Sequence, residues 1–244
     1  MAGVFSRRTC IGAAAGVAVA TVSWILWKMQ DARSVALATA TVAGVPTVAD
    51  ADEVRTFTVT VNNKAGGTYT ISTAAAADGT ETITTVAAVK VKVALRTYTY
   101  ELNSTEVWKN GKLVSVDAKS NDDGKRKAVT AAAGADGLTV TVNNAARKIG
   151  ADVITSTGVR PPAADKVRDT VLFDAEDGSE TAVRVEPLGA CRVTLNGQVI
   201  DGTRFRVTGK DVAAEWWFDK NGRVIRQEMK WDGHKVVLEL TGVK

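Results

Sequence analysis

Residues 83–95 read Ile83-Thr-Thr-Val-Ala-Ala-Val-Lys-Val-Lys-Val-Ala-Leu95, and this stretch decides the fold class. In an extended chain, successive side chains point to opposite faces, so one face here is mostly apolar and the other carries threonine and lysine. One apolar face and one solvated face are typical of an antiparallel sheet, whereas a buried parallel strand is apolar on both faces. Because a strand this long must coil with the twist of its sheet, we expect a curved sheet.

The period of two continues on both sides of this strand. Upstream, Phe57, Val59 and Val61 alternate with threonines, and Asn62–Asn63 and Gly66–Gly67 turn the chain into a second strand. Turn signals recur about every dozen residues, the spacing of an all-β sandwich or barrel. Further strands are expected at 98–108, 113–116, 128–131, 138–142, 153–155, 182–187, 191–195, 204–208, 213–218, 224–230 and 236–240.

One segment breaks this rhythm. Pro161–Pro162 is followed by residues 163–172, which lack the period of two, and we expect one short helix there. The predicted fold class is therefore all-β: a curved antiparallel sheet forming an open half-barrel with one short helix. A helix of the N-terminal signal or anchor precedes it.

The N-terminus has the features of an export signal. Arg7 and Arg8 precede an Ala/Gly-rich apolar stretch and then small residues at 36–40. The pattern resembles a twin-arginine signal but has Cys10 where that signal usually has phenylalanine. An ordinary Sec signal and an uncleaved membrane anchor are the alternatives. We expect a signal or anchor at 1–38, a flexible spacer at 39–55 and the β-domain at 56–244. The expected partner is the twin-arginine or Sec export machinery, and the expected location is periplasmic or otherwise extracytoplasmic, with or without an inner-membrane anchor.

The net charge of +4 does not indicate a nucleic-acid-binding protein. Four of the 31 basic residues and one of the 27 acidic residues lie in 1–38, which leaves 27 against 26 in the rest of the chain. Binding to a phosphate backbone needs a clustered basic face. The one short run, residues 125–127, follows a turn and is expected at a solvated hairpin end.

The sequence offers little material for catalysis or for a metal site. His234 is the only histidine, and Cys191 is the only cysteine outside the leader. The carboxylate clusters at 121–124 and 174–178 lack the alternating spacing of a calcium loop. Glu106 and Glu215 are the best candidates for a glycosidase-like acid–base pair, but each lies beside a tryptophan near a turn, which favours a position at the rim. We therefore expect no enzyme activity, no metal and no cofactor.

Several segments together resemble an uncharacterised family of exported bacterial proteins that is catalogued as a domain of unknown function. The matching segments are 57–61, 66–69, 98–100, 106–115, 120–124, 204–209 and 217–224. The resemblance covers most of the chain from Glu53 to Gly242. It implies an architecture similar to the open half-barrel of bacterial lipoprotein carriers, in which a concave face holds an acyl chain beneath a short helix.

The aromatic residues supply the candidate binding residues. Tyr98, Tyr100, Trp108 and Trp217 are candidates for lining a ligand, and packing in the core is the alternative for each. Trp216 and Trp217 are adjacent on a strand and should point to opposite faces. The leading hypothesis is a non-catalytic extracytoplasmic protein that binds or carries a lipid or another apolar ligand on its concave face. A structural or interaction module of the cell envelope is the alternative, and an envelope hydrolase is the third possibility.

Overall fold

The structure is a computed structural model, and it describes residues 52–93, 96–163, 165–231 and 233–244. The expected leader, with Arg7 and Arg8, lies outside the described residues, as does most of the expected spacer. Within the part that is described, no helix has the length and apolarity needed to cross a membrane.

The described residues form fifteen β-strands. The first meander comprises β1 (Glu53–Val61), β2 (Lys64–Ala75), β3 (Thr80–Val93), β4 (Arg96–Lys109), β5 (Lys112–Asp122), β6 (Lys125–Gly134), β7 (Gly137–Val142) and β8 (Ala145–Ile149). The second comprises β9 (Val153–Thr155), β10 (Arg168–Phe173), β11 (Glu180–Leu195), β12 (Gln198–Gly209), β13 (Val212–Asp219), β14 (Val224–Trp231) and β15 (His234–Val243). β1 thus includes the last three residues of the range expected to be spacer.

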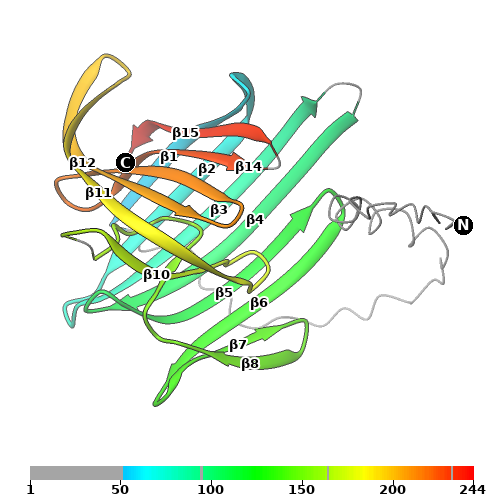
Figure 1. The fold of residues 1–244 in the computed structure, drawn as a ribbon. Helices are drawn as coiled ribbons and strands as arrows, with labels where there is room; N and C mark the ends of the chain where they lie inside the picture. The colour runs from blue at the N-terminus through cyan, green and yellow to red at the C-terminus, as the bar shows by residue number, and fades with distance from the viewer. Residues whose placement is uncertain (1–51, 94–95, 164, 232) are drawn as a thin grey trace, which may run out of the picture. The chain divides into compact units, whose positions relative to one another are not determined.

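All the strands belong to one sheet in the order β8-β7-β6-β5-β4-β3-β2-β1-β15-β14-β13-β12-β11-β10-β9. The two meanders join in the middle, where β1 pairs antiparallel with β15, and the sheet curls around a concave face (Figure 1). The sheet does not close, because its edges are β8 and β9 and these two strands are not hydrogen-bonded neighbours. The expected curved antiparallel sheet is confirmed, apart from the parallel pair of β9 and β10.

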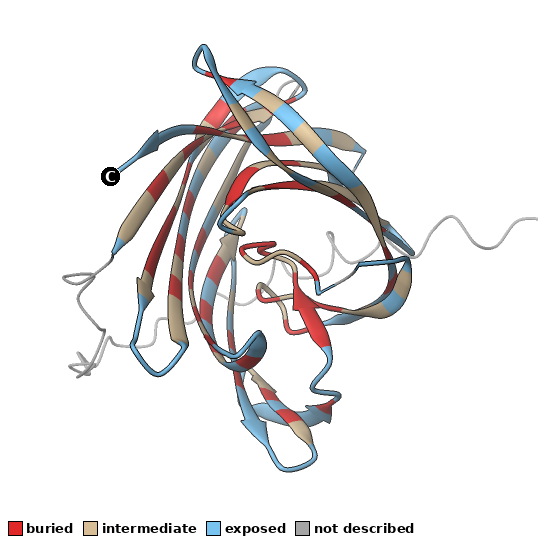
Figure 2. Ribbon diagram, turned by 90° about the vertical axis from the view of Figure 1, so that its left-hand side faces the viewer, coloured by how far each residue is buried: buried red, intermediate tan, exposed pale blue. Residues whose placement is uncertain are grey.

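The alternation read from the sequence determines which side chains face inward. Phe57 lies opposite Tyr69 on β2 and opposite Leu240 on β15, and all three side chains are buried. The rings of Phe57 and Tyr69 meet edge to face, with their centroids 6.1 Å apart. Buried residues recur at every second position along the strands, and the chain inside the curve is largely buried as well (Figure 2).

The Asn-Gly signals mark tight hairpins as expected. Asn110 and Gly111 have φ values of 50° and 77°, and Asn196 and Gly197 have 49° and 78°. Two successive positive φ angles define the turn whose twist matches the flanking strands, and asparagine and glycine adopt this conformation most easily.

The expected short helix at 163–172 is wrong for the described residues, which contain no helix. Strand β10 begins at Arg168 instead. Val171, Leu172 and Phe173 pair with β9 on one side, and all of β10 pairs with β11 on the other. This backbone pairing, with the burial of Leu172 and Phe173, outweighs the weak helical preference of the segment.

Candidate functional site

The concave face of the sheet is the expected site, and part of the chain itself occupies it. We call residues 153–163, which comprise β9 and the segment after it, the strap. Most of the strap is buried, including Ile154, Thr155, Thr157 and Val159. The strap lies against strands of both meanders, through the contacts described below.

The sheet register places the side chains that hold the strap on the concave face. In the first meander, the inward row passes from Phe57 through Tyr69 and Ala87 to Leu102. Glu106 is an even number of residues beyond Leu102 on β4, so it faces the same way. In the second meander, the row passes from Leu238, two residues before Leu240, through Gln227 to Trp216.

Glu106 on β4 contacts the first turn of the strap through hydrogen bonds. Its carboxyl group meets the hydroxyl of Thr155 at 3.0 Å and also contacts the hydroxyl of Thr157. The indole N–H of Trp108 donates to the same carboxyl group at 2.9 Å. Glu106 is 1% exposed, so the expected position at the rim is wrong. Burial raises its pKa, against the opposing effect of these hydrogen bonds.

Gln227 and Trp216 hold the strap from the opposite side. The Gln227 side-chain amide donates to the carbonyls of Thr157 and Gly158, at 2.9 and 3.1 Å. Gly158 has a φ of 57°, and a Cβ placed on it would lie 2.9 Å from Trp216 Cε2 and 2.7 Å from Gln227 Nε2. The strap therefore approaches these side chains closely only because residue 158 is glycine.

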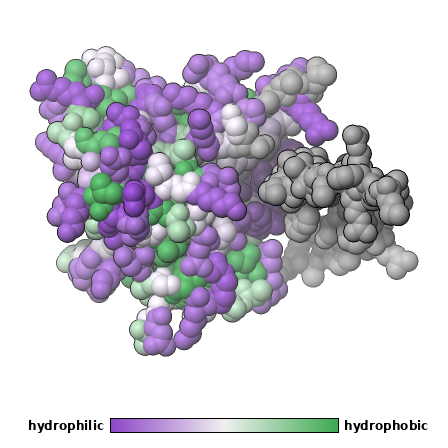
Figure 3. All heavy atoms as spheres, viewed as in Figure 1, coloured by the Kyte–Doolittle hydropathy of each residue, from purple (hydrophilic) through white to green (hydrophobic). Residues whose placement is uncertain are grey.

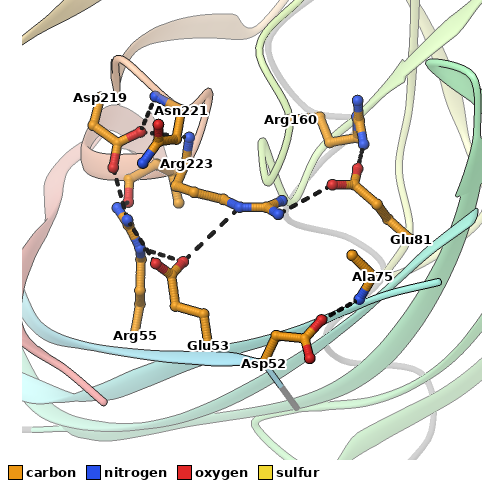
Figure 4. A network of polar contacts seen from close by, with 10 residues as sticks. Asp52, Glu53, Arg55, Ala75, Glu81, Arg160, Asp219, Asn221 and Arg223 are labelled. Carbon is orange, nitrogen blue, oxygen red and sulfur yellow. Dashed lines mark hydrogen bonds and ion pairs between the residues drawn. The ribbon is translucent and has the colours of Figure 1, made fainter. Parts of the chain in front are cut away.

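A chain of ion pairs connects the C-terminal part of the strap to the sheet (Figure 4). Arg160 on the strap pairs with Glu81 on β3, and Glu81 also pairs with Arg223 at 3.0 Å. Arg223 continues the chain to Glu53 at 3.9 Å, and through Glu53 the chain reaches Arg55.

Arg55 completes this chain. Its guanidinium group lies 2.7 Å from Asp219 and donates to the carbonyl of Val224 at 3.2 Å. The network thus joins β1, β3, the β13–β14 turn and the strap, and its three arginines balance three carboxylates. Because most of these groups are half-buried, they are screened less than surface pairs.

The turn between β10 and β11 bridges the open seam of the sheet. Ser120 on β5 donates to the carbonyl of Glu176 at 3.3 Å, and Lys127 on β6 pairs with Asp177 at 3.4 Å. A Cβ on Gly178 would lie 2.4 Å from Val142 Cγ2 on β7. The two meanders therefore meet here through side chains, without backbone pairing.

The contribution of this turn to the stability of the fold depends on pH through Glu176. Burial, together with the nearby Asp174 carboxylate, raises the pKa of Glu176 from 4.5 to about 7. Since the raised pKa favours the protonated form in the folded state, the stabilisation is complete below about pH 4.5 and is lost as pH rises through about 7.

Replacing Glu176 by glutamine removes this titration. Allowing for partial exposure, E176Q should be more stable than the wild type by about 1–2 kcal/mol near pH 8 and about equally stable near pH 5. Urea unfolding at the two pH values checks this. An equal difference at both values would show that Glu176 does not titrate in this range.

The four aromatic candidates do not come together. Trp108 lies under the strap, with the Arg160 guanidinium 5.6 Å from its ring centroid. Tyr98 packs on Trp231 with ring centroids 4.9 Å apart, and its hydroxyl contacts Asp122. Tyr100 is two residues further along the same face of β4, and burial raises its pKa strongly.

Trp217 lies on the outer face, opposite Trp216, as the alternation predicts. The guanidinium groups of Arg204 and Arg226 lie 4.8 and 5.6 Å from its ring centroid. A shallow hollow of about 320 Å³ lies on this outer face. Its lining comprises Arg206, Thr208, Ala213, Ala214, Glu215, Glu228, Met229, Lys230 and Lys235.

The two candidate acid–base residues lie on opposite faces of the sheet. Glu215 is two residues from Trp217 and pairs with Arg204 and with Arg206, the latter at 3.1 Å. Glu106 is buried beneath the strap. Two carboxyl groups on opposite faces cannot flank one glycosidic bond.

Sequence reasoning singled out Glu106 and Trp108, but for other roles, and it did not identify Gln227, Thr155 and Thr157. Gln227 is one polar residue in a strand with mixed faces, and Thr155 and Thr157 look like ordinary strand threonines. Their contacts join positions 49 to 70 residues apart. The one local signal was the break in the period of two near Pro161–Pro162, where the chain leaves the regular sheet.

Comparison with known proteins identifies the family and the fold, and it gives no information about activity. A family model described as "Domain of unknown function (DUF6134)" matches residues 57–241. No curated protein matches the chain. Among solved structures, the chain is similar to the "Beta-barrel-like Protein of Domain of Unknown Function DUF1849 from Brucella abortus", with a TM-score of 0.59 and 13% identity. The match covers 80% of this chain and 98% of that one, and at this identity it shows the fold alone.

Proposed function

The chain belongs to the DUF6134 family, and we propose that it is a non-catalytic extracytoplasmic β-domain acting as a structural or interaction module of the cell envelope. The observation that carries this proposal is the strap in the concave face. In a carrier of apolar ligands, that face would have to be free to receive the cargo. Here the strap occupies that face, and Glu106 and Gln227 hold the strap in place through hydrogen bonds.

Displacing the strap would leave several buried polar groups without partners. Gln227 would lose two acceptors, and the Glu106 carboxyl would lose two hydroxyl contacts. Each buried group left unpaired costs about 1–3 kcal/mol. An acyl chain has no polar groups to replace these contacts, so apolar burial alone would have to offset the loss.

The remaining parts of the proposal rest on the sequence and on the surroundings of the carboxylates. The leader with Arg7 and Arg8 supports export, by the twin-arginine or the Sec machinery. Glu106 is covered by the strap, and Glu215 is paired with arginines, so neither carboxyl group is free to meet a substrate as a general acid. On the face shown in Figure 3, hydrophobic side chains form separate patches among hydrophilic ones.

A second candidate function, binding of an apolar ligand, is favoured by one observation away from the strap. Trp231 is 40% exposed and packs against the half-buried Tyr98 at an interplanar angle of 46°, which places an aromatic pair where β4 begins and β14 ends. A partly accessible aromatic pair of this kind can hold the apolar part of a ligand.

Native mass spectrometry distinguishes the two functions. The mature protein, purified from the periplasm without detergent, is expected to show the mass of the polypeptide alone, before and after incubation with envelope lipids. A lipid-range mass that disappears on organic extraction would contradict the proposal. If this mass were also lost in a Trp231→Ala variant, the ligand would be assigned to the Tyr98–Trp231 pair.

A further inference from the structure

Glu106 is a buried carboxyl group with no cation to balance it. Within the described ranges, no lysine, arginine or histidine forms an ion pair with it, and its contacts are two hydroxyls and one indole N–H. An ionised carboxylate in such surroundings bears a large desolvation penalty, which buried groups commonly avoid by becoming neutral.

A count of hydrogens leads to the same conclusion independently. Three oxygen–oxygen contacts form a ring: Thr155 to Glu106 at 3.0 Å, Thr155 to Thr157 at 2.9 Å, and Thr157 to Glu106. Each hydroxyl has one hydrogen to donate, and a carboxylate has none. The ionised state thus supplies two hydrogens for three contacts, whereas a neutral carboxylic acid supplies the third.

We propose that Glu106 is a neutral carboxylic acid in the folded protein and that its proton clasps the strap to the concave face. In this state the Glu106 hydroxyl donates to Thr157, Thr157 donates to Thr155, and Thr155 donates back to the second carboxyl oxygen. The indole N–H of Trp108 donates to that same oxygen. Ionisation removes one hydrogen from the ring and leaves an unbalanced charge in a buried site, so the hold of Glu106 on the strap weakens. This device acts whether or not the module binds a ligand.

The other titratable groups described around Glu106 do not supply a positive charge that could balance an ionised carboxylate. Arg160 on the strap is paired with Glu81 on β3. Tyr69 on β2 is buried, and its own raised pKa keeps it neutral. The cross-strand neighbours of Glu106 are Ile83 on β3 and Val116 on β5, and β14 contributes the uncharged Gln227 to the strap.

The sign of the pH effect follows from the burial of the acid. Burial raises the pKa of Glu106 above its ordinary value of 4.5. The clasp is therefore complete below that value, and it weakens as pH rises toward the raised pKa of the closed state. Over that interval the opening equilibrium of the strap changes by up to about tenfold per pH unit.

Hydrogen exchange of residues 153–159, corrected for intrinsic rates, tests the clasp in the full chain between about pH 5 and pH 9. Wild-type protection should fall as pH rises, by up to about tenfold per unit. In E106Q the amide provides an NH₂ donor group and a carbonyl acceptor where the neutral acid has a hydroxyl and a carbonyl. E106Q should therefore keep the protection that the wild type has at acid pH and lose the pH dependence.

The opposite pattern would overturn the proposal. If the carboxyl group is ionised, the protection of residues 153–159 in the wild type will not depend on pH. In E106Q this protection will then be more than about tenfold lower than in the wild type, because a neutral amide cannot replace a charge-assisted acceptor. Should E106Q fail to fold, the ¹³C shift of the wild-type Glu106 carboxyl decides the matter. A shift typical of the protonated acid at neutral pH supports the clasp, and a carboxylate shift refutes it.

Discussion

Replacing Trp216 by alanine is expected to lower the free energy of unfolding by about 3–5 kcal/mol, the usual cost of deleting a large core side chain. Trp216 is 2% exposed, faces inward between Phe205 and Gln227, and packs against Gly158 of the strap. Its indole N–H has no hydrogen-bond partner among the described residues, so the loss comes from packing. Denaturant unfolding measures the effect.

Trp217→Ala is the matched control, because it deletes the same side chain from the adjacent position. Trp217 is also buried, at 7% exposed, but it faces outward, where the guanidinium groups of Arg204 and Arg226 lie over its ring. These long side chains can collapse into part of the space, so the remaining cavity is smaller and we expect a loss of about 2–3 kcal/mol, below that of W216A. A larger loss for W217A than for W216A would show that the two faces are wrongly assigned.

Gly158→Ala is expected to destabilise the protein by about 2–4 kcal/mol. The new Cβ would come within 3 Å of both Trp216 Cε2 and Gln227 Nε2. The φ of 57° adds a cost of about 1 kcal/mol, because a side chain in the left-handed region crowds its own backbone. Overpacking of this kind costs about 1–3 kcal/mol more. Thermal or denaturant unfolding measures the sum.

Gly111→Ala separates the two costs. Gly111 also has a positive φ, 77°, but nothing lies within 4 Å of where its Cβ would be. The same substitution there should cost only about 1 kcal/mol, the backbone part. If G158A cost no more than G111A, Gly158 would not be packed against Trp216, and the strap could not lie where the structure has it.

The fold class could be predicted from the sequence because it depends on local patterns. The period of two in 83–95 and around Phe57 determines which face is buried, and the Asn-Gly pairs determine where hairpins turn. The opposite orientation of Trp216 and Trp217 follows from the same alternation. The family resemblance is confirmed as membership of a domain of unknown function with a β-barrel-like fold.

The strap could not be predicted, because it depends on contacts between distant segments. A buried Glu106 contradicts the usual position of a glutamate beside a turn, and its partners Thr155 and Thr157 are about 50 residues away. The helix expected at 163–172 is wrong for a related reason. The strand over its second half gains hydrogen bonds from β9 and β11, which no local propensity encodes.

The most direct test of the occupied concave face is a nuclear Overhauser experiment between Gly158 and Trp216. In the structure, the Gly158 Cα hydrogen that takes the place of a Cβ points at the Trp216 ring. We expect strong cross-peaks between this hydrogen and the indole protons of Trp216, with the Gly158 resonance displaced by the ring current. A Gly158 resonance at its random-coil position, without cross-peaks to Trp216, would mean that the concave face is open and would contradict the account.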